Sequence, residues 1–109
     1  MAYDEALAER LHEVLANRSD ISERKMFGGL AMMVAGNMAV GVIHDHLMVR
    51  VGPDAYEDLL DDPHARPMDF TGRPMRGFVF VDTPGFADDA DLARWAARGV
   101  EFALSLPPR

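Results

Sequence analysis

The stretch from residue 24 to residue 51 constrains the fold most, because turn-forming residues interrupt its apolar residues at short intervals. Val, Ile, Met and Leu dominate three segments, and Gly36-Asn37 and Asp45 lie at the breaks between them. The three expected strands cover residues 26–35, 38–43 and 47–51. Successive strands joined by such short turns pair antiparallel, so this stretch predicts a three-stranded meander.

A glycine pair, Gly28-Gly29, falls inside the first expected strand. Glycine in a strand interior marks a bulge or a close approach of another segment, and we expect one of these here. The pair could also cradle a phosphate. That reading is disfavoured, because the sequence is not G-x-G-x-x-G and no helix is expected directly after it.

The rest of the chain predicts three helices and two further strands. Apolar residues recur at helical spacing over 4–17 and over 89–106, where Trp95 lies on the apolar stripe. A shorter helix opens at Pro53, and short strands are expected over 66–70 and 77–81. The order is then α-β-β-β-α-β-β-α. Runs of adjacent strands predict an α+β fold with an antiparallel sheet and flanking helices.

The length and composition are those of a single globular domain. The 109 residues, 49% of them hydrophobic, predict one domain over residues 1–109. The absence of cysteine excludes disulfide scaffolds, thiol catalysis and thiolate zinc sites. The acidic N-terminus does not resemble a secretory signal, and no apolar run approaches the ~20 residues that span a bilayer. We therefore expect a cytoplasmic protein without membrane contact.

The net charge of −7, from 18 acidic and 11 basic residues, argues against direct DNA binding. Proteins that bind duplex DNA rely on Lys and Arg to neutralise phosphates. The acidic residues crowd residues 54–62 and 88–91 and could in principle hold a divalent metal. Their spacing matches no EF-hand and no histidine–carboxylate motif, so we interpret them as solvated helix faces and helix-start charges.

Other side chains with catalytic or metal-binding chemistry are few. His44 and His46 would share one face of a strand, as metal ligands sometimes do. However, a turn at Asp45 would direct His46 away, and no third ligand is apparent. The three serines lie at helix ends or in loops, and none lies in a Gly-x-Ser-x-Gly elbow. We expect no catalytic residue, no cofactor and no metal.

The basic residues are the best candidates for a binding site. Those of interest flank or lie on the expected strands, and they are Arg24, Lys25, Arg50, Arg73 and Arg76. Brought together, they would form a positive patch that could bind an anionic ligand, an acidic partner segment or nucleic acid. Alternatively, they are scattered surface residues that pair with the many carboxylates. The sequence leaves both interpretations open.

The chain contains eight methionines, and most of them lie in or beside expected strands. Core packing is the expected role for most, and an interface is left open for a minority. Three helices can cover one face of the expected sheet well, but the other face only in part. We therefore also expect a homodimer, which would bury on the order of 1,200–2,000 Å².

Five short segments resemble the TfoX N-terminal domain family. They are residues 24–30, the glycine turn near Gly36, and residues 65–68, 72–78 and 93–95. The motif residues among them are Phe27, Gly28, Gly29, Pro74, Gly77 and Trp95. The segments occur in the family's order over nearly the whole chain. Lys-Met-Phe-Gly-Gly and Arg-Pro-Met-x-Gly are specific when they occur together.

The resemblance implies an α-β-β-β-α-β-β-α layout similar to that of secretion chaperones. The family takes its name from regulators of natural competence, in which this domain precedes a helical domain of helix-hairpin-helix type. We expect no second domain here, and the resemblance carries over no catalytic residue. The sequence thus predicts a non-enzymatic regulatory module that binds a protein partner, with a link to competence or transcription. The alternative is a protein that binds a small anionic ligand or nucleotide, or an enzyme, through the arginine patch.

Overall fold

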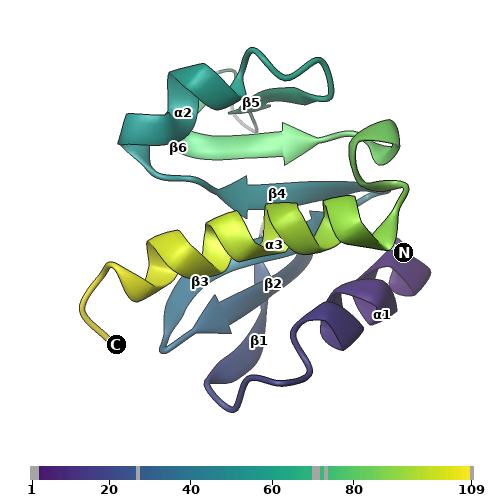
Figure 1. Ribbon diagram of the computed structural model, residues 1–109, viewed down its shortest axis with the longest axis vertical. Coiled ribbons are helices and arrows are strands. Elements are labelled where there is room, and N and C mark those ends of the chain that lie inside the picture. Colours follow the sequence, from purple (N-terminus) through teal and green to yellow (C-terminus); the bar gives the residue numbers. More distant parts are fainter. Residues whose placement is uncertain (1–2, 27, 70–71, 73, 109) are drawn as a thin grey trace.

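The computed structural model describes residues 3–26, 28–69, 72 and 74–108. Within them, three α-helices lie on one side of a six-stranded antiparallel sheet (Figure 1). The helices are α1 (Glu5–Val14), α2 (Pro53–Leu59) and α3 (Asp89–Leu104), and a 3₁₀ turn, η1 (Thr83–Phe86), precedes α3. The strands are β1 (Ile21–Met26), β2 (Gly29–Val34), β3 (Asn37–Ile43), β4 (His46–Arg50), β5 (Ala65–Asp69) and β6 (Pro74–Val81).

The strands lie in the order β1-β2-β3-β4-β6-β5, and every pair is antiparallel. The first four form a continuous meander, and a segment that contains α2 leads from β4 to the edge strand β5. This arrangement confirms the α+β fold and the antiparallel sheet. None of the helices in the described part of the chain has the length and apolar character needed to cross a membrane.

The prediction of three strands in the meander is wrong, because the structure has a fourth, β1. The four central residues of β1 are all exposed and polar or charged, so the strand has no apolar alternation to reveal it. It forms because it closes a hairpin with β2, in which Met26 pairs with Gly29. The backbone of this strand is thus fixed by its neighbour rather than by its own side chains.

The predicted position of the glycine pair inside a strand is also wrong. Gly28 lies in the hairpin turn with a φ of +78°, a conformation that favours glycine. Gly29 opens β2, and a Cβ there would collide with the carbonyl oxygen of Val42 on β3. The close approach expected at this pair is therefore confirmed, and it belongs to Gly29.

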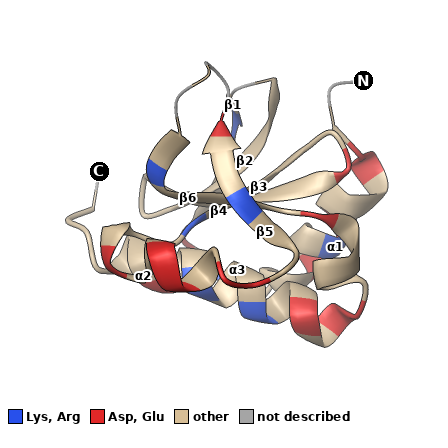
Figure 2. Cartoon of the chain, turned by 90° about the horizontal axis from the view of Figure 1, so that it is seen from above, with Lys and Arg blue, Asp and Glu red and all other residues tan. Residues whose placement is uncertain are grey.

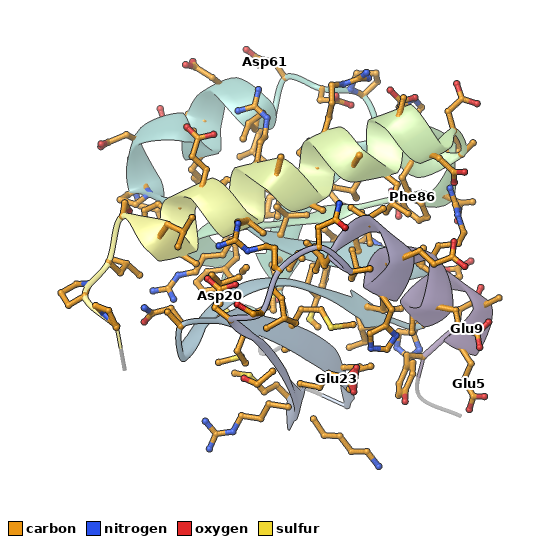
Figure 3. The ribbon with its side chains drawn as sticks, turned by 60° about the horizontal axis from the view of Figure 1, so that its bottom comes forward. Glu5, Glu9, Asp20, Glu23, Asp61 and Phe86 are labelled. Carbon is orange, nitrogen blue, oxygen red and sulfur yellow. The ribbon has the colours of Figure 1, made fainter. Side chains whose placement is uncertain are left out.

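The main core lies between the sheet and the helices. α3 crosses the middle of the sheet, and a Cβ on Gly99 would meet the backbone of Ala39, so glycine allows the helix to lie close to β3. Trp95 is 8% exposed, and its indole N–H donates to the carbonyl oxygen of Gly85 at 3.2 Å. Phe86 fills the space where α1 meets α3 (Figure 3).

The opposite face of the sheet holds a second, methionine-rich core. Its buried members are Ala31, Met33, Met38, Ile43, Met48, Met68 and Phe80. The three helices all lie on the other side of the strands (Figure 2), yet Met48 and Met68 are fully buried. The prediction that most methionines pack in the core is thereby confirmed. Among the described residues, only Leu104 is a large hydrophobic side chain with substantial exposure.

Candidate functional site

A hollow of about 180 Å³ opens on the methionine-rich face of the sheet. Its lining comes from β1, β2, the turn before β3, β3 itself, β4 and β6. The residues are Arg24, Met26, Met33, Gly36, Asn37, Met38, Arg50 and Phe78. We call this feature the arginine–methionine hollow. It unites strands that are far apart in the sequence.

The strand register places Arg24 at the rim of this hollow. Arg24 pairs with Ala31 on β2, whose side chain belongs to the methionine-rich core, so both side chains are on the same face. The adjacent Lys25 pairs with Leu30, which belongs to the core beneath the helices. Because successive side chains alternate along a strand, these two basic residues lie on opposite faces of the sheet.

Arg50 is held in place by two aromatic rings. The guanidinium carbon lies 5.4 Å from the ring centre of Phe78 on β6 and 5.3 Å from that of Phe102 on α3. Contacts of this kind between a cation and a ring face are favourable and restrict the side chain. Arg50 is also only partly exposed. The hollow thus combines one guanidinium held between two rings with that of Arg24, which is an exposed residue.

Two of the other basic candidates, Arg76 and Lys25, lie outside this site. Arg76 donates to a carboxylate oxygen of Glu57 on α2 at 3.2 Å, and its guanidinium lies 5.8 Å from the ring centre of Tyr56. Lys25 faces the helix side, as its pairing shows. Arg73 lies outside the described residues. Of the four candidates that the structure describes, Arg24 and Arg50 are brought together in this hollow.

The motif residues that the structure describes have roles in the fold. Pro74 begins β6, and Gly77 has a φ of +95°, close to the backbone of Gly52. The carbonyl oxygen of Gly77 accepts hydrogen bonds from the backbone N–H groups of Val51 and Gly52, at 2.8 and 3.0 Å. These bonds fix the start of α2 beside the sheet. Phe27 lies outside the described residues.

The hollow offers a ligand the positive charge of two arginines beside an apolar surface of methionine and phenylalanine side chains. The described lining residues include no carboxylate, imidazole, hydroxyl or thiol. The side-chain amide of Asn37 donates to the carbonyl oxygen of Pro107 at 2.9 Å, which ties the C-terminal segment to the start of β3. Many of the acidic residues lie on α1, α2 and the start of α3, on the far side of the sheet (Figure 2).

A histidine cluster lies at the end of β4 away from Arg50. His44 is in the turn, with a φ of 50°, which confirms the predicted turn at Asp45. The turn does not separate the two rings as expected, because their centres are 5.8 Å apart. His46 is buried with its ring edge-on to Phe80, 4.7 Å between centres. Within the described ranges, no three His, Asp or Glu side chains gather closely enough to hold a metal ion.

Burial lowers the pKa of His46, and the positive charge of Arg66 lowers it further. The nearby carboxylates of Asp45 and Asp82 act in the opposite direction. Arg66 lies over the Phe80 ring at 4.9 Å and binds Asp82, which lowers the pKa of that carboxyl. His46 is therefore held in its neutral form at neutral pH.

Sequence reasoning missed a second hollow of about 310 Å³ between α2, η1 and α3. Arg94 and Arg98 line it from α3. Their i, i+4 spacing in the sequence could have predicted that they share one face of this helix. Charges of both signs meet here: Arg94 pairs with Asp91, and Asp62 accepts a hydrogen bond from the backbone N–H of His64 at 2.8 Å. This hollow is less suited to an anion than the arginine–methionine hollow.

The sequence matches the model of the TfoX N-terminal domain over residues 13–103. The chain belongs to the TfoX N-terminal domain family. The match runs from α1 into α3 and includes the whole sheet, so the arginine–methionine hollow lies within this TfoX N-terminal domain. A search of curated proteins finds no match.

Proposed function

We propose that this domain is a non-enzymatic, protein-binding module whose arginine–methionine hollow receives an acidic side chain from a partner protein. The observation that carries the proposal is the convergence of Arg24 and Arg50 on one hollow of a protein whose net charge is −7. Guanidinium groups form strong, directional hydrogen bonds with carboxylates. A site with two of them is matched to an anionic group.

The size and lining of the hollow favour a side chain over a small-molecule ligand. Its volume of about 180 Å³ is below the roughly 300–1,000 Å³ of ordinary ligand pockets. Met26, Met33 and Met38 line its interior, and methionine adapts its shape to different apolar partners. An acidic residue with an apolar neighbour would satisfy both parts of the site.

A regulatory role follows from this kind of contact. A module that binds a partner segment can recruit or sequester the partner without changing it chemically. The link to competence or transcription regulation that the family name suggests fits such a module, and it forms part of this proposal. Binding of a small anion or nucleotide through the same arginines is the alternative.

Selection from a displayed library of random twelve-residue peptides tests the proposal. We expect wild-type protein to enrich peptides that combine acidic and apolar residues, and Arg24→Glu to lose them. Arg98→Glu is the matched control, because Arg98 is exposed on α3, on the other side of the sheet. Enriched peptides without acidic residues, or equal capture by Arg24→Glu, would contradict the proposal. ATP that displaces the peptides at micromolar concentration would favour the alternative.

A further inference from the structure

β1 is an edge strand whose outer side is open to another chain. It pairs with β2, and no other described strand lies beside it. The opposite edge of the sheet, β5, contains Pro67, which has no N–H group to offer to an added strand. β1 contains no proline, and residues 22–25 are all exposed. The two edges of the sheet thus differ in their capacity to accept a further strand.

The register identifies which backbone groups of β1 point outward. The N–H of Ala35 donates to the carbonyl oxygen of Asp20 at 3.1 Å, which makes 20↔35 a hydrogen-bonded pair. Hydrogen-bonded and non-bonded pairs alternate along an antiparallel ladder. The N–H and C=O groups of Ile21, Glu23 and Lys25 are therefore directed away from β2, toward the free edge.

The side chains along this edge define the charge of a suitable partner. Glu23 lies on the helix side of the sheet, where it contacts His12 of α1 (Figure 3). Arg24 lies on the other face, at the rim of the arginine–methionine hollow. A strand added beside β1 would place alternate side chains on the face of Arg24. Acidic residues at those positions would lie beside Arg24.

A second copy of this chain is a poor occupant of the edge. Two β1 strands related by a two-fold axis through their centre would place Glu23 or Arg24 directly opposite its own copy. Like charges directly opposite each other destabilise a strand pair. A segment with acidic residues at alternate positions meets no such repulsion on the face of Arg24.

We infer that the partner segment binds in an extended conformation, as a seventh strand along the outer edge of β1, with its acidic side chains on the face of the arginine–methionine hollow. This inference rests on the proposed function and specifies how the partner is held. Backbone hydrogen bonds to Ile21, Glu23 and Lys25 would supply affinity, and Arg24 at the rim of the hollow would supply selectivity for acidic residues.

Amide hydrogen exchange on the full chain tests the inference, with a blocked octapeptide of alternating valine and glutamate as the probe. We expect saturating peptide to slow exchange at Ile21, Glu23 and Lys25 by about tenfold or more, because their N–H groups become hydrogen-bonded. Ser22 and Arg24 should change less, since their N–H groups already face β2. The same peptide with lysine in place of glutamate is the control, and it should give no such protection.

Backbone methylation of the probe gives a second, independent readout. One peptide carries N-methyl groups on its valines and the other on its glutamates, so each retains N–H groups on one edge only. We expect one of them to bind at least about tenfold more weakly than the other. Weaker binding of the peptide with methylated valines would indicate antiparallel addition, and weaker binding of the peptide with methylated glutamates would indicate parallel addition.

The outcomes separate the two proposals. Two results would overturn strand addition and leave the proposed function standing, provided that binding depends on Arg24. In the first, exchange at the three amides is unchanged by the peptide. In the second, the two methylated peptides bind equally well. Failure of the valine–glutamate peptide to bind would contradict both. Protection of the three amides in wild type and equally in Arg24→Glu would support strand addition and contradict the role of the hollow.

Discussion

Single residues with unusual backbone surroundings set the shape of the first hairpin. Gly28 has a positive φ and open space around its Cα, whereas Gly29 lies against the backbone of β3. Side chains are therefore excluded for two different reasons at neighbouring positions. At Gly28 the cost is conformational, and at Gly29 it is steric.

We expect Gly29→Ala to lower the free energy of unfolding by more than Gly28→Ala. Overpacking against a backbone oxygen costs about 1–3 kcal/mol, and a positive φ costs an L-residue about 1 kcal/mol. Urea denaturation of both variants measures the difference. Gly72→Ala is the control for φ alone, because Gly72 has a φ of +79° and open space. A Gly29→Ala variant as stable as wild type would show that β2 and β3 can move apart at no cost.

The lowered pKa of His46 predicts how the stability of the protein changes with pH. Its pKa is lower in the folded protein than the ordinary value, so the unfolded state binds a proton more readily. Stability should be constant above the unfolded pKa of about 6.5 and should fall as pH drops below it. The contribution of Asp82, whose pKa is also lowered, is lost only in more acidic solution. Chemical denaturation between pH 7 and pH 5 should show a decline that His46→Gln reduces. An equal decline in both proteins would contradict this role.

At the scale of elements, the helices were more predictable than the strands. The expected ranges 4–17 and 89–106 contain α1 and α3, because apolar spacing marks a helix that packs on a sheet. β1 escaped prediction because its exposed polar residues carry no such pattern. Its place in the fold depends on the turn at Gly28 and on pairing with β2, which are tertiary effects.

The candidate site was only partly predictable for the same reason. Arg24 and Arg50 were recognised as basic residues on or beside strands, but their convergence depends on β1, whose register the sequence did not reveal. The division of Arg24 and Lys25 between two faces also follows from that register. Phe78, Met33 and Met38 could be assigned to strands, but not to one hollow.

α3 provides the clearest test of the main core. Trp95 is 8% exposed and also donates a hydrogen bond to Gly85, so it joins α3 to η1. We expect Trp95→Ala to cost about 3–5 kcal/mol, a large part of the stability of a domain this size. Trp95→Phe should cost less, because an aromatic ring still fills much of the site, although the indole hydrogen bond and some packing are lost. Thermal melting compares them, and an alanine variant that melts within a few degrees of wild type would show that Trp95 is peripheral.

At the scale of the whole molecule, the homodimer stays a prediction. The dimer is expected on the ground that one apolar face of the sheet would otherwise be exposed to water. In the structure, the methionines of that face are largely buried within one chain. With Leu104 the only large, well-exposed hydrophobic side chain among the described residues, a dimer would need polar contacts to hold it.

The net charge of −7 predicts weak or no binding to duplex DNA. The two arginines that converge in the described part of the chain would neutralise few phosphates, and duplex binding depends on the counterions released when phosphates are neutralised. Fluorescence anisotropy with a labelled duplex at ~150 mM salt measures this directly. A micromolar or tighter dissociation constant that weakens steeply with added salt would contradict the prediction and revive a role in direct DNA contact.

The most direct test of the proposed site is a reversal of its charge preference. Calorimetric titration gives the dissociation constants of the alternating valine–glutamate and valine–lysine peptides for wild type, Arg24→Glu and Arg98→Glu. We expect wild type and Arg98→Glu to prefer the glutamate peptide by about tenfold or more, or about 1.4 kcal/mol. Arg24→Glu should lose this preference or invert it. An unchanged preference in Arg24→Glu would contradict the claim that the arginine–methionine hollow recognises an acidic partner.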